Sequence, residues 1–389
     1  ALATAGFRLW HANVQTRKNY FDSIFPPQSG QPEFNLHADD IDFQIEADYI
    51  GFMCPGMPQT ANKMADYIGH IMNYGDGVYG GAFVASLYSE AYLQNDIRSV
   101  IEKALLSLPA ESGYRRIIED VIAFHQENSD DWTKCWQMLE DKWARANICN
   151  PGTKYNIDAK LNGAYIVIGL LYGEGDINKT LEISTRCGQD SDCNPASAAG
   201  ILATIQGYSQ IPEYWMKNLR EVENLNFAYT DMSLNQTYQT SFKHALQMIK
   251  RNGGSISGDN ITIVCQTPVP VRFEQAFEGM FPIGRQEIRK ELRHLGSFTF
   301  EGTGIVFTGY IRGAKNYVAQ VEMYVDGKII ERAVLPTGKN HRVDLFWKYQ
   351  LPEGKHIVTF KWLNPDSNAQ IHCNDALIYS NRPLPIPHQ

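Results

Sequence analysis

The sequence lacks several features that would assign it to a class at once. No stretch approaches the roughly 18 uninterrupted apolar residues of a membrane-spanning helix. The densest basic cluster, at 285–293, is interleaved with Glu287 and Glu291, and the 35 basic side chains are outnumbered by 43 acidic ones, giving a net charge of −8. The seven cysteines include no C-x-x-C pair. These absences argue against a membrane span, a nucleic-acid binder, a zinc ribbon and a dense disulfide framework.

The N-terminal residues lack the signals of a protein's natural start. Residues 1–10, ALATAGFRLW, contain no Met, no signal peptide and no N-cap residue ahead of the apolar pattern. They are typical of the middle of a helix. We therefore expect the chain to be a fragment of a longer protein, with any targeting signal upstream. The cell compartment is left open by the sequence, and an exported protein is one option.

The first two thirds of the chain carry apolar residues mainly at helical spacing. The segment 61–74, for example, places Met64, Ile68 and Ile71 on one face. The predicted helices span 61–74, 82–93, 98–107, 115–128, 132–146, 161–172, 177–184, 195–207, 212–224 and 234–251. Because the connections between them are short, the sequence predicts an all-α domain over residues 1–250.

The pattern changes at residues 251–258, RNGGSISG, which have the composition of a linker. Beyond this point the segments are rich in strand-forming residues or alternate between apolar and polar. The predicted strands span 304–311, 318–325, 342–347 and 356–362, with turns at 326–327, 336–338 and 352–354. The predicted fold is therefore multidomain: an all-α domain followed by an all-β sandwich or jelly roll over residues 256–389.

One loop, GQDSDCN at residues 188–194, concentrates candidate metal ligands. Asp190 and Asp192 lie two residues apart, and in an extended segment such residues point to the same side. Two converging carboxylates suit a hard cation such as Mg²⁺ or Mn²⁺. The alternative is that these side chains only cap the helix that starts near Pro195. A calcium loop of the EF-hand type is excluded, because Pro195 and Ile201 occupy its required Gly and Glu positions.

The context of this loop resembles the ADP-ribosylglycohydrolase family. There, a Gly-x-Asp-Thr-Asp-Thr loop leads into a helix of small residues, as GQDSDC leads into PASAAG here. Further resemblances occur in the family's order at MCPGMP (53–58), NYGDGVYGGAFVA (73–85), the paired segments 163–173 and 177–184, and IPEYW (211–215). The resemblance covers roughly residues 40–220. It implies an all-α fold, a dinuclear Mg²⁺ or Mn²⁺ site, and hydrolysis of a bond to the anomeric carbon of ADP-ribose or a related ribosyl group.

The same resemblance assigns metal ligands and reveals two departures. The family's loop places Asp190, Asp192 and Cys193 at the metal. Cys193 stands where the family has a threonine oxygen, and a thiol suits Mg²⁺ poorly, so Asn194 is an alternative oxygen donor. The family's second set of carboxylates comes from an upstream Asp-Asp motif, which we expect in sequence preceding Ala1. If it is lost, the chain would be a ligand-binding protein with a decayed site.

Two further segments carry candidate site residues. The stretch 37–48, HADDIDFQIEAD, is the most acidic in the chain. We predict catalytic carboxylates at Asp40, Asp42 and Glu46, since glycoside hydrolysis generally uses an acid/base pair. The predicted substrate-binding residues are Asp39, Gln44, Asn73, Tyr74, Gly75 and Gly77. The competing interpretations are a solvated acidic loop and a tight turn between helices. Asp158 and Asn162 either cap a helix or line the pocket.

The β-rich part offers aromatic residues that could stack on sugar rings. They are Tyr310, Tyr317, Tyr324, Trp347 and Trp362, and core packing is the competing interpretation for each of them. A glycan bound at this domain motivates a second hypothesis, a glycosidase acting on a polysaccharide or glycoconjugate. The first hypothesis remains a metal-dependent hydrolase with an ADP-ribosyl or other sugar-containing substrate.

Overall fold

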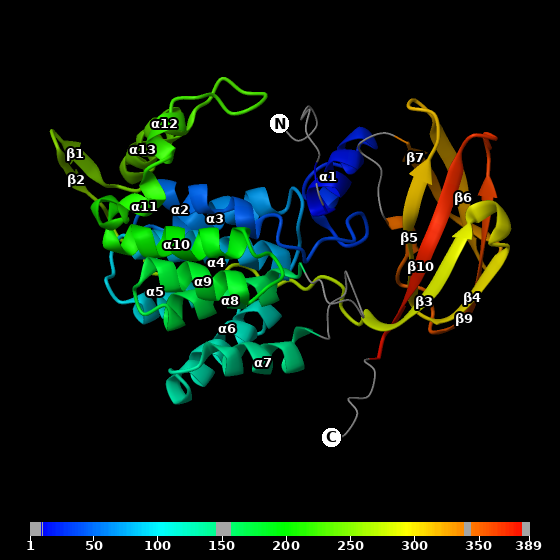
Figure 1. Ribbon diagram of the computed structural model, residues 1–389, viewed down its shortest axis with the longest axis horizontal. Helices are drawn as coiled ribbons and strands as arrows, with labels where there is room; N and C mark the ends of the chain where they lie inside the picture. Colours follow the sequence, from blue (N-terminus) through cyan, green and yellow to red (C-terminus); the bar gives the residue numbers. More distant parts are fainter. Residues whose placement is uncertain (1–8, 10, 145–156, 338–343, 383–389) are drawn as a thin grey trace. The chain divides into compact units, whose positions relative to one another are not determined.

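The computed structural model describes residues 9, 11–144, 157–337 and 344–382. The chain divides into two compact units (Figure 1). Among the described residues, the helical unit comprises 11–144 and 157–276, and the β unit comprises 277–337 and 344–382. The residues expected to form the middle of a helix, 1–10, fall almost entirely outside the described part of the chain.

Helices build the first unit in the order that the apolar spacing indicates. Their bounds are α1 His11–Phe21, α2 Asp48–Met53, α3 Pro58–Gly69, α4 Asp76–Ala91, α5 Ile97–Leu105, α6 Gly113–Glu127, α7 Trp132–Lys142, α8 Ala159–Tyr172, α9 Ile177–Arg186, α10 Cys193–Gln206, α11 Glu213–Met216, α12 Leu219–Val222 and α13 Leu234–Arg251. The single helix predicted over 212–224 is in fact two short ones. Helices α1 and α2 were not predicted.

The core of this unit is organised around α4 and α8. Every residue of α4 except Asp76, and every residue of α8 except Lys160, is buried. Both helices are apolar on all sides, as expected for helices that are enclosed by others. Small residues allow the close approach that this enclosure requires: a side chain at Gly81 would collide with the Phe43 ring, and one at Gly163 with Tyr114.

The segment after α13 belongs to the helical unit, although its composition suggested a linker into the β domain. A hairpin of β1 (Ser255–Ser257) and β2 (Asn260–Thr262) comes first. The chain then runs in extended form along the helices: Gln266 N donates to Gly56 O at 2.9 Å, and Val271 N to Ser107 O at 2.9 Å. The boundary between the units accordingly lies between Ala276 and Phe277.

Glu274 fixes the end of this segment in the helical unit. Its carboxylate lies 2.9 Å from His70 Nε2 and accepts the Gly75 N–H at 2.9 Å, while its backbone carbonyl accepts the Tyr79 hydroxyl at 2.9 Å. The Glu274 side chain is only 5% exposed. A buried carboxylate with these partners gives the segment a specific place on the surface of α3 and α4.

The β unit is a sandwich of two antiparallel four-stranded sheets. Its strands are β3 Phe281–Glu291, β4 Ser297–Gly302, β5 Gly304–Arg312, β6 Val318–Val325, β7 Lys328–Pro336, β8 Asp344–Lys348, β9 Gly354–Trp362 and β10 Gln370–Ser380. The orders are β3-β10-β5-β8 and β4-β9-β6-β7. Rings from the two sheets meet in the core, with Phe307 of β5 at 5.2 Å from Phe360 of β9 and Phe346 of β8 at 4.6 Å from Phe360.

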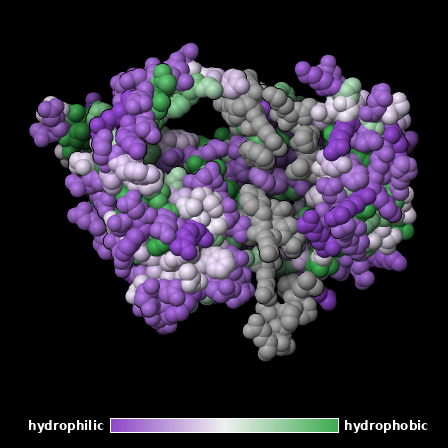
Figure 2. All heavy atoms as spheres, viewed as in Figure 1, coloured by the Kyte–Doolittle hydropathy of each residue, from purple (hydrophilic) through white to green (hydrophobic). Residues whose placement is uncertain are grey.

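The predicted architecture is confirmed: a helical unit precedes an all-β sandwich. Strands β3, β4, β7 and β10 of the sandwich were not predicted. The face shown in Figure 2 is mainly hydrophilic over both units, with hydrophobic residues in small separate patches. Among the described residues, no helix combines the length and apolar character needed to cross a membrane.

The substitution Gly81→Ala should destabilise the helical unit, although alanine is the better helix former. The added methyl group would collide with the buried Phe43 ring, and overpacking of this kind typically costs about 1–3 kcal/mol. Thermal unfolding measures the effect. Gly284→Ala in β3 is the matched control, because nothing lies within 4 Å of the position that its methyl group would take. An unchanged or raised melting temperature for Gly81→Ala would contradict this packing.

The contact between His70 and Glu274 should make stability depend on pH. Burial alone lowers the pKa of His70, but its hydrogen bonds to Glu274 and to the Asp66 carbonyl raise it above the ordinary value. The resulting stabilisation is complete below the unfolded pKa of about 6.5 and decreases as the pH rises through the folded pKa. The loss of stability in Glu274→Gln should therefore be largest near pH 6 and smaller near pH 8. Urea unfolding across this range measures it, and a constant difference would rule the mechanism out.

Candidate active site

The turn from His37 to Asp40 is the structural centre of the candidate site. The side chain of Asn73, which is completely buried, holds it. Asn73 Nδ2 donates to the carbonyl oxygens of Ala38 and Asp40, both at 2.9 Å, and its Oδ1 accepts the Phe43 N–H at 3.1 Å. A weaker contact reaches the His37 carbonyl at 3.3 Å. One amide therefore fixes the backbone that presents the acidic stretch.

Asp39 lies in a group of carboxylates around one lysine. Burial raises the pKa of Asp39 well above its usual range, and the charges of Asp76, Asp158 and Asp40 raise it further, against the effect of Lys160. Lys160 Nζ contacts Asp158 closely and lies 3.7 Å from Asp76 Oδ2. Burial alone would lower the pKa of Lys160, but the surrounding carboxylates outweigh it and raise the value. Lys160 is thus a fixed cation among these acidic side chains.

Two backbone links hold α8 against the acidic turn. Asp40 and Asp158 form an antiparallel bridge, and the Ala159 N–H donates to the Asp39 carbonyl at 2.9 Å. The Asp158 side chain also caps α8 by accepting the Leu161 N–H at 3.1 Å. The capping role considered for Asp158 is therefore confirmed, and its carboxylate also belongs to the acidic group around Lys160.

Asn162, one turn into α8, connects this group to the loop 188–194. Its Nδ2 donates to the Asp158 carbonyl at 2.9 Å. Its Oδ1 accepts the Asp190 N–H at 3.2 Å and the Asn194 amide at 2.8 Å. Asn162 is completely buried. The side chain thus positions the Asp-Ser-Asp loop next to the end of α8 that carries Asp158 and Lys160.

The three predicted metal ligands of the loop come together. The donor atoms of Asp190, Asp192 and Cys193 all lie within 4.8 Å of one another. Asp190 is half-buried and Asp192 is exposed. Burial and the neighbouring carboxylates raise the pKa of Asp190 to about 6, while Cys193 hydrogen-bonds to it. Burial and Asp190 raise the pKa of the Cys193 thiol to about 12, so that it is a hydrogen-bond donor at neutral pH.

The predicted catalytic carboxylates belong to a different set of contacts, formed with α1. Asp42 accepts two hydrogen bonds from Asn13, from its backbone N–H at 3.1 Å and its Nδ2 at 2.8 Å. Glu46, which is exposed, accepts from the same Nδ2 at 2.9 Å. Asp40 lies 2.8 Å from His37 Nδ1 and 3.4 Å from His11 Nδ1. Burial and the charge of Asp40 raise the pKa of Asp42 to about 7.

Most of the predicted substrate-binding residues have structural contacts within the helical unit. Asn73 is engaged in holding the turn, and buried Gln44 accepts the Tyr114 hydroxyl at 2.8 Å. Gly77 lies so close to the Ala38 carbonyl that a side chain would collide with it, and a side chain at Gly75 would collide with Ala276. Tyr74 is half-buried, and its backbone N–H donates to the Ala38 carbonyl.

Three acceptor oxygens are suited to a hard cation. Asp39 Oδ1, Asp190 Oδ2 and Asn194 Oδ1 are buried, and none has a hydrogen-bond partner among the described residues. Burying such groups without a partner is costly. All three are oxygens, which are the ligands that Mg²⁺ and Mn²⁺ prefer. The donor set on the loop side of Asn162 therefore fits the metal that the family resemblance implies.

Sequence reasoning missed Asp76, Lys160 and the bridging role of Asn162. The spacing of Asp158 and Asn162 was the available signal, since residues four apart lie on one face of a helix. It indicated a cap or a pocket wall without choosing between them. The partnership of Lys160 with Asp76 has no local signal, because 84 positions separate the two in the sequence.

The aromatic candidates of the β unit are half-buried. Arg293 lies over the Trp362 ring at 4.4 Å, and Arg312 lies over Tyr310 at 4.7 Å, where His372 also stacks. The Tyr317 hydroxyl accepts the Trp362 N–H, and the Tyr324 hydroxyl donates to Glu322. Ring faces at Trp362 and Tyr310 are thus already covered by cationic side chains.

The substitution Asn162→Leu should loosen the loop 188–194. Leucine has a similar size but cannot accept hydrogen bonds from the Asp190 N–H or the Asn194 amide. The Asp190 amide hydrogen should therefore exchange faster, by about 10-fold for each 1.4 kcal/mol of stabilisation that the loop loses. Hydrogen exchange followed by NMR measures this. Asn128→Leu at the end of α6 serves as the control. Unchanged exchange at Asp190 would show that Asn162 does not hold the loop.

Comparison with known proteins identifies the family. The sequence model described as ADP-ribosylglycohydrolase matches residues 4–242, more than half of the chain. The search of curated proteins gives no match. Among solved structures, a family GH115 4-O-methyl-alpha-glucuronidase with specificity for decorated arabinogalactans aligns at 7% identity and a TM-score of 0.21, over 84% of this chain and 42% of that one. So weak a likeness supports no conclusion about activity. From the family match, the chain belongs to the ADP-ribosylglycohydrolases, whose members hydrolyse glycosidic bonds.

Proposed function

We propose that this protein is a divalent-metal-dependent hydrolase of an N- or O-glycosidic bond to an ADP-ribosyl or related ribosyl group. One observation carries the proposal: Asn162 seats the Asp190–Asn194 loop beside the carboxylates around Lys160, and buried oxygens on both sides lack hydrogen-bond partners among the described residues. Such an arrangement suits a metal ion bound by the protein together with a substrate that carries several hydroxyl groups.

Asp190, Asp192 and Asn194 are the residues that we assign to the metal. Asp190 and Asn194 each have an unpartnered oxygen, and Asp192 is exposed at the same loop. A bound Mg²⁺ or Mn²⁺ would orient the ribose hydroxyl groups and polarise a water molecule. Cys193 has a different role in this proposal. Its protonated thiol donates a hydrogen bond to Asp190 and orients that carboxylate, since a thiol is a poor ligand for these ions.

Asp39 is the residue that we assign to proton transfer, in place of Asp40, Asp42 and Glu46. Its Oδ1 is unpartnered, and burial raises its pKa, which makes its carboxylate a stronger base than that of an exposed aspartate. Asp42 and Glu46 already accept hydrogen bonds from Asn13. Asp39 would take the proton of the attacking water as the water oxygen bonds to the anomeric carbon, and the leaving group would depart with the electron pair of the glycosidic bond and take up a proton from solvent. Lys160 favours the ionised form of Asp39 and so would keep it able to accept that proton.

The substitution Asp190→Asn should abolish metal-dependent turnover. Replacing one charged ligand should lower kcat/KM by roughly 100-fold or more. The assay follows hydrolysis of ADP-ribosylated protein and of a glycan panel, with and without Mg²⁺ or Mn²⁺. Asp141→Asn, an exposed carboxylate at the end of α7, is the matched control and should retain activity. Asp39→Asn should lower kcat more than it changes KM.

Two results would overturn the proposal. Wild-type protein without metal-dependent turnover on any of these substrates would exclude a hydrolase of this type. Turnover restricted to glycans would instead favour the glycosidase hypothesis and exclude the ADP-ribosyl substrate.

A further inference from the structure

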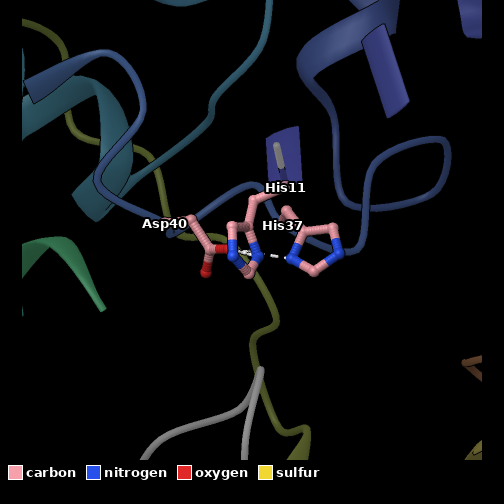
Figure 3. Close-up of side chains that lie close together, drawn as sticks. All are labelled: His11, His37 and Asp40. Carbon is pink, nitrogen blue, oxygen red and sulfur yellow. Dashed lines mark hydrogen bonds and ion pairs between the residues drawn. The ribbon is translucent and has the colours of Figure 1, made fainter. Parts of the chain in front are cut away.

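We propose that His11, His37 and Asp40 form a binding site for a transition-metal ion of the Zn²⁺ type, which fastens α1 to the acidic turn. The three side chains lie together in Figure 3. The site is separate from the Mg²⁺ or Mn²⁺ ligands assigned above. It does not depend on the proposed hydrolase activity, because it rests on its own residues and is tested by binding.

The donor atoms already converge. His37 Nδ1 lies 2.8 Å and His11 Nδ1 3.4 Å from the same oxygen of Asp40, and one ligand atom from each residue lies within 4.8 Å of the others. The two imidazole rings meet edge to face with their centroids 5.1 Å apart. The Asp40 side chain is fully buried, and the His37 and His11 side chains are 10% and 25% exposed. An ion could therefore enter from the His11 side.

The spacing is close to that of a tetrahedral site. Ligands about 2.0–2.1 Å from a Zn²⁺ ion lie about 3.3 Å from one another. The separation of His11 from Asp40, 3.4 Å, already matches this value. His37 has to move by about half an ångström from its 2.8 Å contact, exchanging a hydrogen bond for coordination. A water molecule or another ligand would complete four-coordination.

The chemistry of the donors selects the kind of ion. Two imidazole nitrogens and one carboxylate suit Zn²⁺, Ni²⁺, Fe²⁺ or Cu²⁺, whereas Mg²⁺ prefers oxygen ligands alone. A second observation points to a bound cation. Asp40 Oδ1 is buried and has no hydrogen-bond partner among the described residues. A fully buried carboxylate with an uncompensated oxygen is stabilised by a metal ion more than by one neutral imidazole.

The backbone around the three ligands is held independently of any ion. Asn73 fixes the carbonyls of the turn, and Asn35 Oδ1 accepts the His37 N–H at 3.1 Å. Asn35 Nδ2 also donates to the Ala12 carbonyl of α1 at 3.2 Å. Asn13, two residues after His11, anchors α1 to Asp42. Rigid support of this kind lowers the cost of gathering metal ligands.

The alternative occupant of this arrangement is a proton. In that case a protonated histidine would pair with Asp40, and no ion would bind. The two possibilities differ in stoichiometry: a metal site binds one Zn²⁺ per chain, whereas an ion pair binds none.

Metal binding to the full chain, after removal of metals with a chelator, decides between them. Calorimetric titration with Zn²⁺ and the visible absorption of bound Co²⁺ report the site. We expect one Zn²⁺ per chain, a Co²⁺ spectrum of imidazole coordination, and a rise in the melting temperature of the helical unit on adding Zn²⁺. His11→Ala and His37→Ala should each weaken binding at least about 100-fold. His244→Ala, an exposed histidine of α13, should not weaken it.

Two further controls separate loss of Zn²⁺ binding from misfolding and from binding at the Asp190 loop. His37→Gln keeps a polar side chain and should retain the fold, as circular dichroism checks, while losing Zn²⁺. Asp190→Asn and excess Mg²⁺ should leave Zn²⁺ binding unchanged. The proposal is wrong if no Zn²⁺ binds. It is also wrong if binding survives both histidine substitutions, or if Asp190→Asn removes it while His37→Ala does not.

Discussion

The buried amide of Asn73 is the constraint on which the candidate site depends. It fixes the carbonyls and N–H groups of the segment from His37 to Phe43, and thereby the directions of the carboxylates on that segment. The side chains of neighbouring residues in this segment consequently contact different groups. Asp39 interacts with the group around Lys160, while Asp40 contacts His11 of α1 as well as His37, and Asp42 contacts Asn13 of α1. A flexible loop of the same composition would expose these charges to water.

Asparagine recurs where this fold has to join two segments. Asn162 links α8 to the Asp190 loop, and Asn35 and Asn13 link α1 to the acidic stretch. An amide donates and accepts without carrying charge, so Asn73 and Asn162 bind the backbone beside Asp39 and Asp190 without hydrogen-bonding to these two carboxylates. The carboxylates therefore keep unpartnered oxygens. The cost is burial of negative charge, which raises the pKa values of Asp39 and Asp190.

Much of the fold could be predicted from the sequence, because apolar spacing is a local signal. The helices of the core and several strands of the sandwich follow from it. It failed for α1, whose buried residues are largely polar: Asn13, Gln15, Thr16 and Asn19. The grouping of Asp190, Asp192 and Cys193 was also within reach, since the three share one loop. The distant partners of the acidic stretch were not, because His11 reaches Asp40, and Asp76 and Lys160 reach Asp39, only through tertiary packing.

The extended segment that follows α13 has a practical consequence. It reaches Glu274, which binds both His70 and the Gly75 N–H, one residue from the Asn73–Tyr74 pair that holds the acidic turn. A recombinant helical unit that ended at the glycine-rich stretch near residue 253 would lose this support, although it would keep every helix. A fragment that preserves this support therefore has to extend at least to Glu274.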